Sequence, residues 1–556
     1  MIADFVDVSE SRKIDTEICI VGGGAAGITL ALQLIGSGID VLMLESGGYA
    51  PDERVQDLYA GEVADELLHS PPDRYRQRRF GGSTTIWGGR CMPYDAIDFE
   101  TRDYVPNSGW PFGLDELLPY YPAANRLCEA GRFAYRVDEA FQRPLPPVIQ
   151  GFTSEDFSAD TLERFSCPTD FGRRYGSRLA AAANVRVLLH ANVTAIRLAP
   201  DGGSVSELSV SDLQGNTVSV RARRYVLAAG GLEIPRLLLA NRDVQPHGIG
   251  NDHGVVGRYY MCHIAGTIGQ IRIDGPLSSV HYGYDISDEG VYCRRRLALR
   301  PETQRAQRLG NFVARLHHPR ISDPAHRNAV LSSLYLAKFA IPYEYGKRLH
   351  GGDKVSVRDW LCHVRNVVRS PFDAAGFAWH MARDRKFAER KFPSIIIRPR
   401  RNLYSLDFHA EQQPSPSSRV QLSDRMDPLG MPRLRIDWRY TEGDVDTCRR
   451  ALDLLSRSMA RSGIATFDYD ANSVELEMTR FGAYGGHHIG TARMGVDPRF
   501  SVVNADCRIH GIRNLYLSGS ATFPTSSQAN PTLTVVAMSL RMAEHLRQSR
   551  SAGDGW

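Results

Sequence analysis

The sequence predicts an α/β protein with more than one domain, and three observations support this. The chain has 556 residues, more than a single hydrophobic core usually covers. Near the N-terminus, a short apolar strand, a glycine-rich turn and an apolar helix follow one another in EICIVGGGAAGITLALQLIGSGIDVLMLESGG. Further along, VLLHANVTAIRL begins a run typical of a three-stranded meander, which closes on YVLAAGGLEIPRLLLANR.

The composition and charge of the chain exclude several classes of function. Hydrophobic residues make up 42% and charged residues 23% of the chain, as in ordinary globular proteins. A net charge of +4 is too small for this length to indicate a nucleic-acid binder. The nine cysteines include no CxxC pair, which argues against a disulfide framework or a zinc site, so we expect no metal. The sequence shows no signal peptide and no transmembrane run, and we expect a cytoplasmic protein.

The N-terminal glycine turn predicts a dinucleotide site. Gly22 permits a tight turn, Gly24 lets a pyrophosphate approach the backbone, and Gly27 lets helix and strand pack closely. The helix that follows offers free N–H groups and a positive dipole end to phosphates. Glu45 follows the second strand, 41 to 44, where a carboxylate can hold ribose hydroxyls. Together these features indicate a Rossmann-like unit, without separating FAD from NAD.

Four further stretches carry a family resemblance. They are GGSTTIWGG at 81 to 89, VLAAGGLEIPRLLL, HHIGTARMG and SGSATFPTSSQANPTLTVVAMSL. With these, the chain resembles the glucose-methanol-choline (GMC) oxidoreductases, and within them the sugar and glycoside oxidoreductases of the pyranose type. The matching pieces run from residue 17 to residue 546, although the middle third matches loosely. The resemblance implies a Rossmann-like FAD-binding domain and a substrate-binding domain of antiparallel sheet plus helices.

The resemblance also implies a set of FAD-binding positions. Relatives that attach FAD covalently do so through a histidine before the tryptophan of the second motif. Ile86 stands there in this chain, so we expect non-covalent FAD. The implied FAD-binding residues are Gly22, Gly24, Ala26, Gly27, Glu45, Gly81, Gly82, Ser83, Thr84, Val193, Ala229, Gly230, Gly519, Ser520, Pro531 and Thr532.

The domain boundaries follow from the placement of these motifs. We expect a discontinuous FAD-binding domain in three parts and a substrate-binding domain that covers the flavin ring. The expected ranges are 1–105, 165–255 and 485–556 for the FAD-binding domain, 106–164 for a connecting segment, and 256–484 for the substrate-binding domain.

The paired histidines in GGHHIGTARMG are the candidates for proton transfer. Histidine suits this task because its pKa lies near working pH. The family pattern places the base three residues before the glycine of the Gly-Thr pair, which selects His487. His488 would point to the opposite face of an extended segment. In this reading His487 is catalytic and His488 is structural.

Two further residues have both a functional and a structural interpretation. Asn530 precedes Pro531 and an apolar helix, so it could cap that helix, while the family uses this position to bind the substrate oxygen. Gln412 precedes a strand in LDFHAEQQPSPSSRVQLS. It could bind sugar hydroxyls, as glutamine does in sugar-oxidising relatives, or lie in a solvated turn.

The resemblance implies an FAD-dependent oxidation of an alcohol. A sugar or glycoside hydroxyl would become a carbonyl by hydride transfer to flavin N5, with His487 as base. A polyol, sterol or aliphatic alcohol is an alternative substrate, and a flavin-retaining lyase is an alternative enzyme class. The electron acceptor, O2 or another molecule, and the oligomeric state stay open.

One basic region stands apart from this scheme. Residues 345 to 401 contain 14 Lys and Arg against 5 Asp and Glu. Trp360, Leu361, Val364, Val367 and Val368 fall on one side of a helix there. We expect this apolar stripe to pack on the domain core behind a solvated basic face. An anionic substrate, an anionic membrane or a subunit partner are the alternatives for this region.

Overall fold

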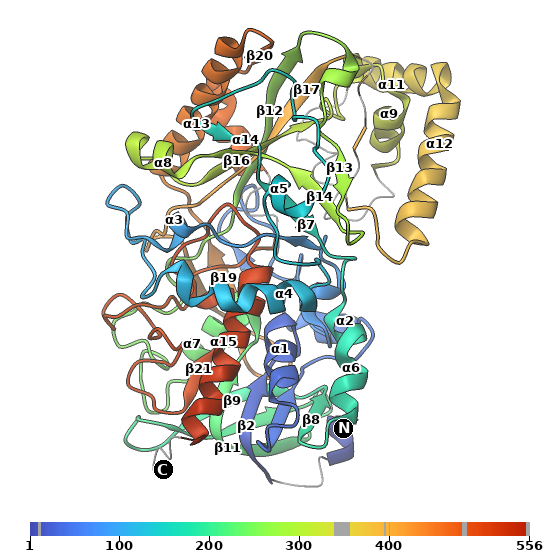
Figure 1. The fold of residues 1–556 in the computed structure, drawn as a ribbon. Coiled ribbons are helices and arrows are strands. Elements are labelled where there is room, and N and C mark those ends of the chain that lie inside the picture. Colours follow the sequence, from blue (N-terminus) through green and yellow to red (C-terminus); the bar gives the residue numbers. More distant parts are fainter. Residues whose placement is uncertain are drawn as a thin grey trace.

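The structure, a computed structural model, describes residues 1–8, 13–338, 356–393, 396–397, 399, 401–480 and 486–551. The largest sheet lies in the lower half of Figure 1, and a six-stranded sheet lies in the upper half. Two smaller sheets complete the described architecture. The α/β class predicted from the sequence is confirmed.

The large sheet combines a parallel core with an antiparallel meander. Strand β3 is Val41–Leu44, as the sequence predicts, and it pairs in parallel with β2, Lys13–Val21. The predicted meander is β9, β10 and β11, paired antiparallel in succession. The order is β1-β8-β3-β2-β11-β10-β9, and β21 pairs with β11. The remaining bounds are β1 Ile2–Asp4, β8 Val185–Leu189, β9 Asn192–Leu198, β10 Val205–Ser211, β11 Thr217–Leu227 and β21 Leu515–Leu517.

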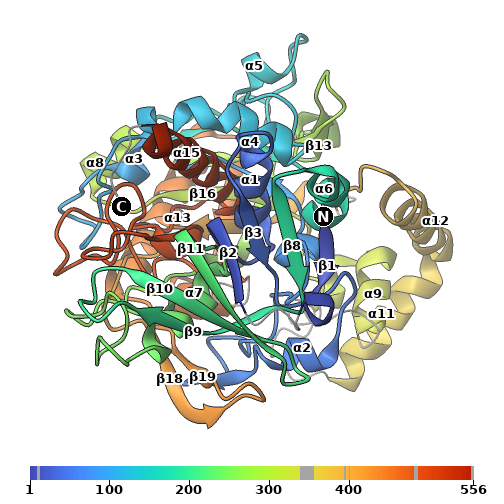
Figure 2. The same ribbon diagram turned by 90° about the horizontal axis from the view of Figure 1, so that it is seen from below.

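Two helices from opposite ends of the chain pack together against this sheet (Figures 1 and 2). Helix α1, Ala25–Leu34, is apolar on nearly every side, because the sheet covers one face and α15, Thr532–Ser551, covers another. A Cβ on Gly27 would overlap the Gly22 carbonyl oxygen. Glycine is therefore required where α1 crosses the strand.

The six-stranded sheet has the order β20-β12-β17-β16-β15-β6 and is covered by α13, Glu442–Ser462, and α14, Val474–Arg480. Helix α13 begins at a capping box formed by Thr441 and Asp444 and ends at Gly463, whose φ is +69°. The strands are β20 Ala465–Asp468, β12 Ile264–Ile273, β17 Leu403–Ala410, β16 Phe312–His317, β15 Leu297–Leu299 and β6 Phe157–Ser158.

The two small sheets join segments that are distant in sequence. One has the order β13-β14-β7-β5 and the other β18-β19-β4. Both β4 and β5 fall within the first expected FAD-binding segment, yet they pair with strands from later segments. The bounds are β4 Gly61–Val63, β5 Arg90–Cys91, β7 Leu162–Phe165, β13 Tyr284–Ile286, β14 Tyr292–Arg295, β18 Arg419–Met426 and β19 Pro432–Asp437.

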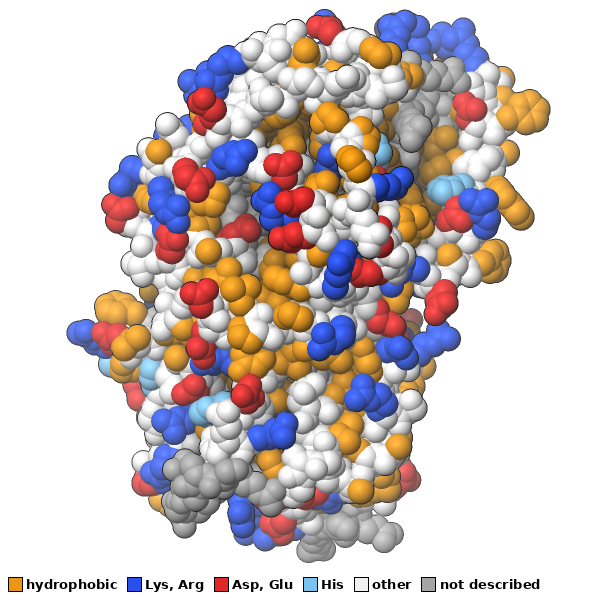
Figure 3. All heavy atoms as spheres, viewed as in Figure 1, with side chains coloured by type: hydrophobic (Ala, Val, Ile, Leu, Met, Phe, Trp, Pro, Cys, Tyr) orange, Lys and Arg blue, Asp and Glu red, His pale blue; other side chains and the backbone are white. Residues whose placement is uncertain are grey.

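The basic region forms two helices at one edge of the molecule, α11, Val357–Arg369, and α12, Pro371–Met381 (Figure 1). The expectation that its apolar stripe packs on the domain core is wrong for Trp360, Leu361 and Val368, which are 49%, 57% and 72% exposed. Instead the polar His363 is buried and bonds Ser332 Oγ at 3.0 Å. Figure 3 shows hydrophobic and basic side chains together along this edge. Residues 345 to 355 of the basic region lie outside the described residues.

Within the described residues, every helix is too short or too polar to span a bilayer.

Candidate active site

One cavity of about 770 Å³ collects most of the residues that the sequence singled out. Its size lies toward the upper end of the range for ligand sites. The Gly81, Gly27 and Gln412 positions do not line it. The expected residues that do line it are Gly22, Gly24, Ala26, Glu45, Gly82, Ser83, Thr84, Val193, Ala229, Gly230, His487, Gly519, Ser520, Asn530, Pro531 and Thr532.

The turn between β2 and α1 is held by Glu45. Its two carboxylate oxygens accept the N–H groups of Gly23 at 2.7 Å and Gly47 at 2.8 Å. Burial raises the pKa of Glu45 above its ordinary value, and these two amides together with Arg78 oppose that shift. Gly22 has a φ of +111°, which favours glycine. The carboxylate thus orders the turn and also faces the cavity.

The backbone around the cavity fits an extended dinucleotide such as FAD. Gly230 and Gly519 have φ values of +85° and +133°, and no atom lies within 4 Å of the place where a Cβ would stand. The Cβ that Gly82 lacks would lie 3.0 Å from the Gly24 Cα, so the two glycine turns face each other closely. Glycine at these positions leaves the backbone N–H groups open to a phosphate.

A buried ion cluster near the same end of the cavity was missed by the sequence analysis. Glu233 binds Arg76 at 3.2 Å, Arg78 at 3.1 Å and Arg236 at 3.2 Å. Burial opposes ionisation, yet Arg236, Arg78 and Arg76 hold the pKa of Glu233 at about 2. The run YRQRR at 75 to 79 was the available signal, although the acid that it pairs with lies more than 150 residues away.

His487 faces the cavity as a half-buried ring beside His263, with their ring centroids 4.6 Å apart. Burial, with additional repulsion from His263 and Arg90, lowers the pKa of His487 well below 6.5. Its imidazole is therefore neutral near neutral pH and able to accept a proton.

Asn530 also faces the cavity, and its side-chain oxygen is buried without a hydrogen-bond partner. Helix α15 begins at Thr532, and an N-cap side chain would accept one of the first helical N–H groups. The Asn530 oxygen accepts none, so the capping interpretation does not hold in this structure.

His488 also lines the cavity, and its buried ring joins a network that extends behind the wall. Its Nδ1 lies 2.7 Å from the Tyr260 hydroxyl, and the His69 Nε2 lies 2.7 Å from the same oxygen. The Cys262 thiol donates to that oxygen at 3.2 Å. His69, Cys262 and His488 lie close enough together to ligate a metal ion. In this structure, however, their ligand atoms are all hydrogen-bonded to the Tyr260 hydroxyl.

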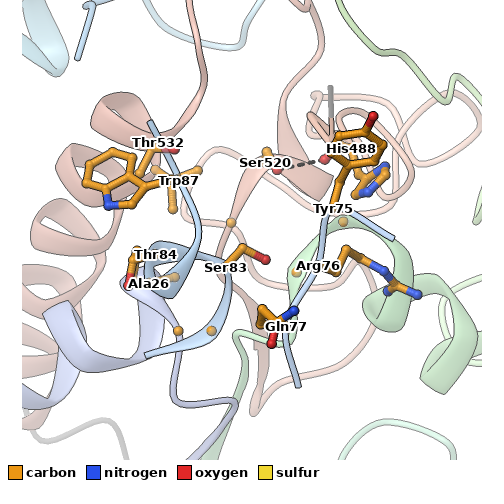
Figure 4. Close-up of a pocket in the computed structure, with 18 of the residues that line it drawn as sticks. Ala26, Tyr75, Arg76, Gln77, Ser83, Thr84, Trp87, His488, Ser520 and Thr532 are labelled. Carbon is orange, nitrogen blue, oxygen red and sulfur yellow. Dashed lines mark hydrogen bonds between the residues drawn. The ribbon is translucent and has the colours of Figure 1, made fainter. Parts of the chain in front are cut away.

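Burial lowers the pKa of His488 well below 6.5, so its ring is neutral, and for a neutral His69 the protons of this network can be placed. His69 Nδ1 lies 2.6 Å from the Ser70 carbonyl, which only accepts, so the His69 proton is on Nδ1. His69 Nε2 then accepts from Tyr260, and the Tyr260 oxygen accepts from His488 Nδ1–H. The remaining His488 nitrogen, Nε2, is buried and unpaired. Ser520 Oγ donates to the His488 carbonyl at 2.7 Å and so ties down the backbone beside His487 (Figure 4).

The Gln412 side chain does not take part in substrate binding in this structure. It is fully buried, its oxygen accepts from the Cys262 N–H and Trp438 Nε1, and its nitrogen donates to the Arg439 carbonyl. The expectation of a sugar-binding Gln412 is corrected accordingly. His409, near the end of β17, lines the cavity instead of Gln412.

Comparison with known proteins agrees with this architecture. A family model described as GMC oxidoreductase matches residues 414–539. The 6'''-hydroxyparomomycin C oxidase of Streptomyces lividus is 26% identical, over 96% of this chain and 93% of its own length. The paromamine 6'-oxidase of Streptomyces fradiae is 24% identical, over 95% and 90%.

Among solved structures, pyridoxine 4-oxidase from Mesorbium loti has the same fold. Its TM-score is 0.54 at 20% sequence identity, and the match covers 96% of this chain and 99% of that one. The paired histidines and Asn530 lie within the matched residues 414–539, and the glycine turns, which precede that range, line the same cavity. Residues 414–539 thus match the GMC oxidoreductase family, relatives along nearly the whole chain are oxidases, and the protein is an enzyme that oxidises CH–OH groups.

Proposed function

We propose that the protein binds FAD non-covalently and oxidises a hydroxyl of a sugar or glycoside to a carbonyl, with His487 as the base. The observation that carries the proposal is the shared cavity. A neutral His487 ring and an unpaired Asn530 oxygen line the same space as the glycine turns. The relatives oxidise paromamine and 6'''-hydroxyparomomycin C, which supports a sugar-like substrate.

When bound, FAD would supply the two-electron acceptor for the carbinol hydride. His487 accepts the hydroxyl proton, because its neutral ring has no competing partner among the described residues. Asn530 orients the substrate oxygen with its amide. Gly22, Gly24 and Gly82 would hold the FAD pyrophosphate with backbone N–H groups.

The start of α15 has an electrostatic role in this scheme. Pro531 and Thr532, at the N-terminal end of the helix, line the cavity. The positive end of the helix dipole therefore acts on charge in the cavity. It stabilises the negative charge that develops as the alcohol is oxidised.

Flavin reduction measured without oxygen tests the proposal directly. Sugars, glycosides and polyols are mixed rapidly with the holoenzyme, and bleaching of the flavin is followed. His487→Ala should slow bleaching by about 10²–10⁴-fold, the usual contribution of a positioned base. The wild-type rate should stay flat from pH 8 to about 6.5 and fall only at lower pH, because the pKa of His487 is depressed.

His488→Ala and Asn530→Ala are the matched comparisons. Asn530→Ala should retain flavin and lose part of the rate. His488→Ala should lose stability more than rate, because its ring bonds Tyr260 behind the wall. A dead His488→Ala beside a fully active His487→Ala would transfer the role of base to His488. A flavin that no alcohol bleaches would contradict the oxidation itself.

A further inference from the structure

The end of the cavity near His487 is rich in arginine. Arg90 on β5 and Arg294 on β14 line it, and Asp407 on β17 is the acid that accompanies them. Arg90 Nη1 lies 3.5 Å from His409 Nε2, and the His409 ring is 6.3 Å from that of His263. Because His263 packs against His487, these arginines belong to the substrate end of the cavity.

The carboxylates at this end are already engaged by Arg315, which lies behind the wall. Arg315 binds Glu163 at 2.6 Å and Asp407 at 3.3 Å. Arg90 shares Glu163 at the longer distance of 3.7 Å. Three guanidinium groups, of Arg90, Arg294 and Arg315, thus face two carboxylates. Arg296, two residues after Arg294, lies 4.0 Å from another acid, Asp95.

Arg294 stands opposite Glu163 on the neighbouring strand and, after Arg315 and Arg90, helps to lower the pKa of that acid, but it does not bind the carboxylate directly. It is 5% exposed, its Nη2 donates to the Leu316 carbonyl at 2.7 Å, and its buried Nε has no hydrogen-bond partner. Within the described part of the chain it forms no ion pair. Burial and then repulsion from Arg315 lower the pKa of Arg90 to about 10, which reflects the same excess of positive charge. An unpaired buried charge is costly unless something neutralises it.

We propose that the substrate carries an oxyanion, which binds between Arg90 and Arg294 and completes the charge balance of the cavity. The inference rests on the proposed alcohol oxidation and adds the substrate class. A carboxylate fits best, because one negative charge matches an excess of one positive charge and its two oxygens match a guanidinium fork. A phosphate dianion would leave the cavity with one excess negative charge, and an ammonium group would be repelled by the arginines.

Ligand binding without turnover is the first test. The oxidised holoenzyme is titrated with methyl β-D-glucopyranoside, its 6-carboxylate, its 6-phosphate and its 6-amino derivative, and binding is followed by calorimetry and by the flavin spectrum. The carboxylate should bind roughly 10- to 150-fold more tightly than the neutral parent, as expected for a hydrogen bond to a charged group. The phosphate should fall between them, and the amine should bind most weakly.

Variants assign the effect to the cavity. Arg294→Gln should bring the affinity for the carboxylate to within about threefold of the neutral sugar, whose own affinity stays unchanged. Arg294→Lys keeps the charge and should keep most of the preference. The control is Arg457→Gln on α13, an exposed arginine paired with Asp453, which removes the same charge outside the cavity and should change nothing.

The outcomes separate this inference from the proposed function. Equal affinity for the neutral and carboxylate ligands, preference for the amine, or a carboxylate preference that survives Arg294→Gln would overturn it. If neutral alcohols then bleach the flavin, the oxidation stands and the anion site does not. If the carboxylate binds through Arg294 and no alcohol bleaches the flavin, the anion site stands and the oxidation does not.

Discussion

The Tyr260 hydroxyl joins three parts of the chain, and its removal should cost both stability and rate. Tyr260 is fully buried, and burial raises the pKa of its phenol well above 10, so it keeps its proton. Tyr260→Phe removes the hydroxyl that bonds both His69 Nε2 and His488 Nδ1. A buried polar group without its partner costs about 1–3 kcal/mol, which gives about 2–6 kcal/mol for the two.

The rate effect follows from the position of His488. The network anchors the residue beside His487, and loss of the anchor lets the base shift. A displacement of about 1 Å can cost roughly 10²-fold in rate, which sets the upper limit for Tyr260→Phe. The flavin should stay bound to Tyr260→Phe. Of the four side chains in the network, His69, Tyr260, Cys262 and His488, His488 alone lines the cavity.

Denaturant unfolding and rapid-mixing flavin reduction measure the two effects. Tyr440→Phe is the control, since it removes an exposed tyrosine hydroxyl bonded to Glu475, and it should cost less than about 1 kcal/mol. In a double-mutant cycle, Tyr260→Phe and His488→Ala should couple by about 0.5–3 kcal/mol. If Tyr260→Phe unfolds at the same denaturant concentration as the wild type and shows no coupling to His488→Ala, the network and the proton placement derived from it are wrong.

Two further predictions concern the cofactor. Acid precipitation should release all of the yellow colour to the supernatant, because Ile86 stands at the covalent attachment position; flavin that stays with the pellet would refute non-covalent binding. Glu45→Ala should purify with less flavin and unfold at lower denaturant, since the Gly23 and Gly47 amides each lose a charged acceptor worth about 1.5–3 kcal/mol; full flavin occupancy at unchanged stability would show that the carboxylate holds neither turn nor ribose.

Local patterns in the sequence were sufficient for the elements of the dinucleotide-binding unit. Strand 41–44 follows from a short continuous apolar run, and the meander after residue 185 follows from alternation of apolar residues. The turn at Gly22 follows from a conformation that glycine adopts readily. These features depend on neighbours within a few residues. The roles of His487 and Asn530 rest on their place within local motifs and stay predictions.

Other features required the tertiary structure. Gln412 was expected either at the substrate or in a solvated turn, and it is buried instead. Which side chains at the end of a strand face the cavity depends on how the neighbouring strands pack, and the local sequence does not reveal this. The stripe that includes Trp360 was expected in the core and is exposed, because helical periodicity reveals an apolar face without revealing what covers it.

The charges and protons of the site also depend on long-range contacts. His69, Tyr260 and His488 meet from three distant segments, and Arg90, Arg294 and Arg315 meet from three different strands. Sequence alone determined the local backbone conformations and the residue types available for chemistry. Folding decided which of them share a buried, low-dielectric space, and in such a space the pairing of each charge and hydrogen bond determines what the cavity binds.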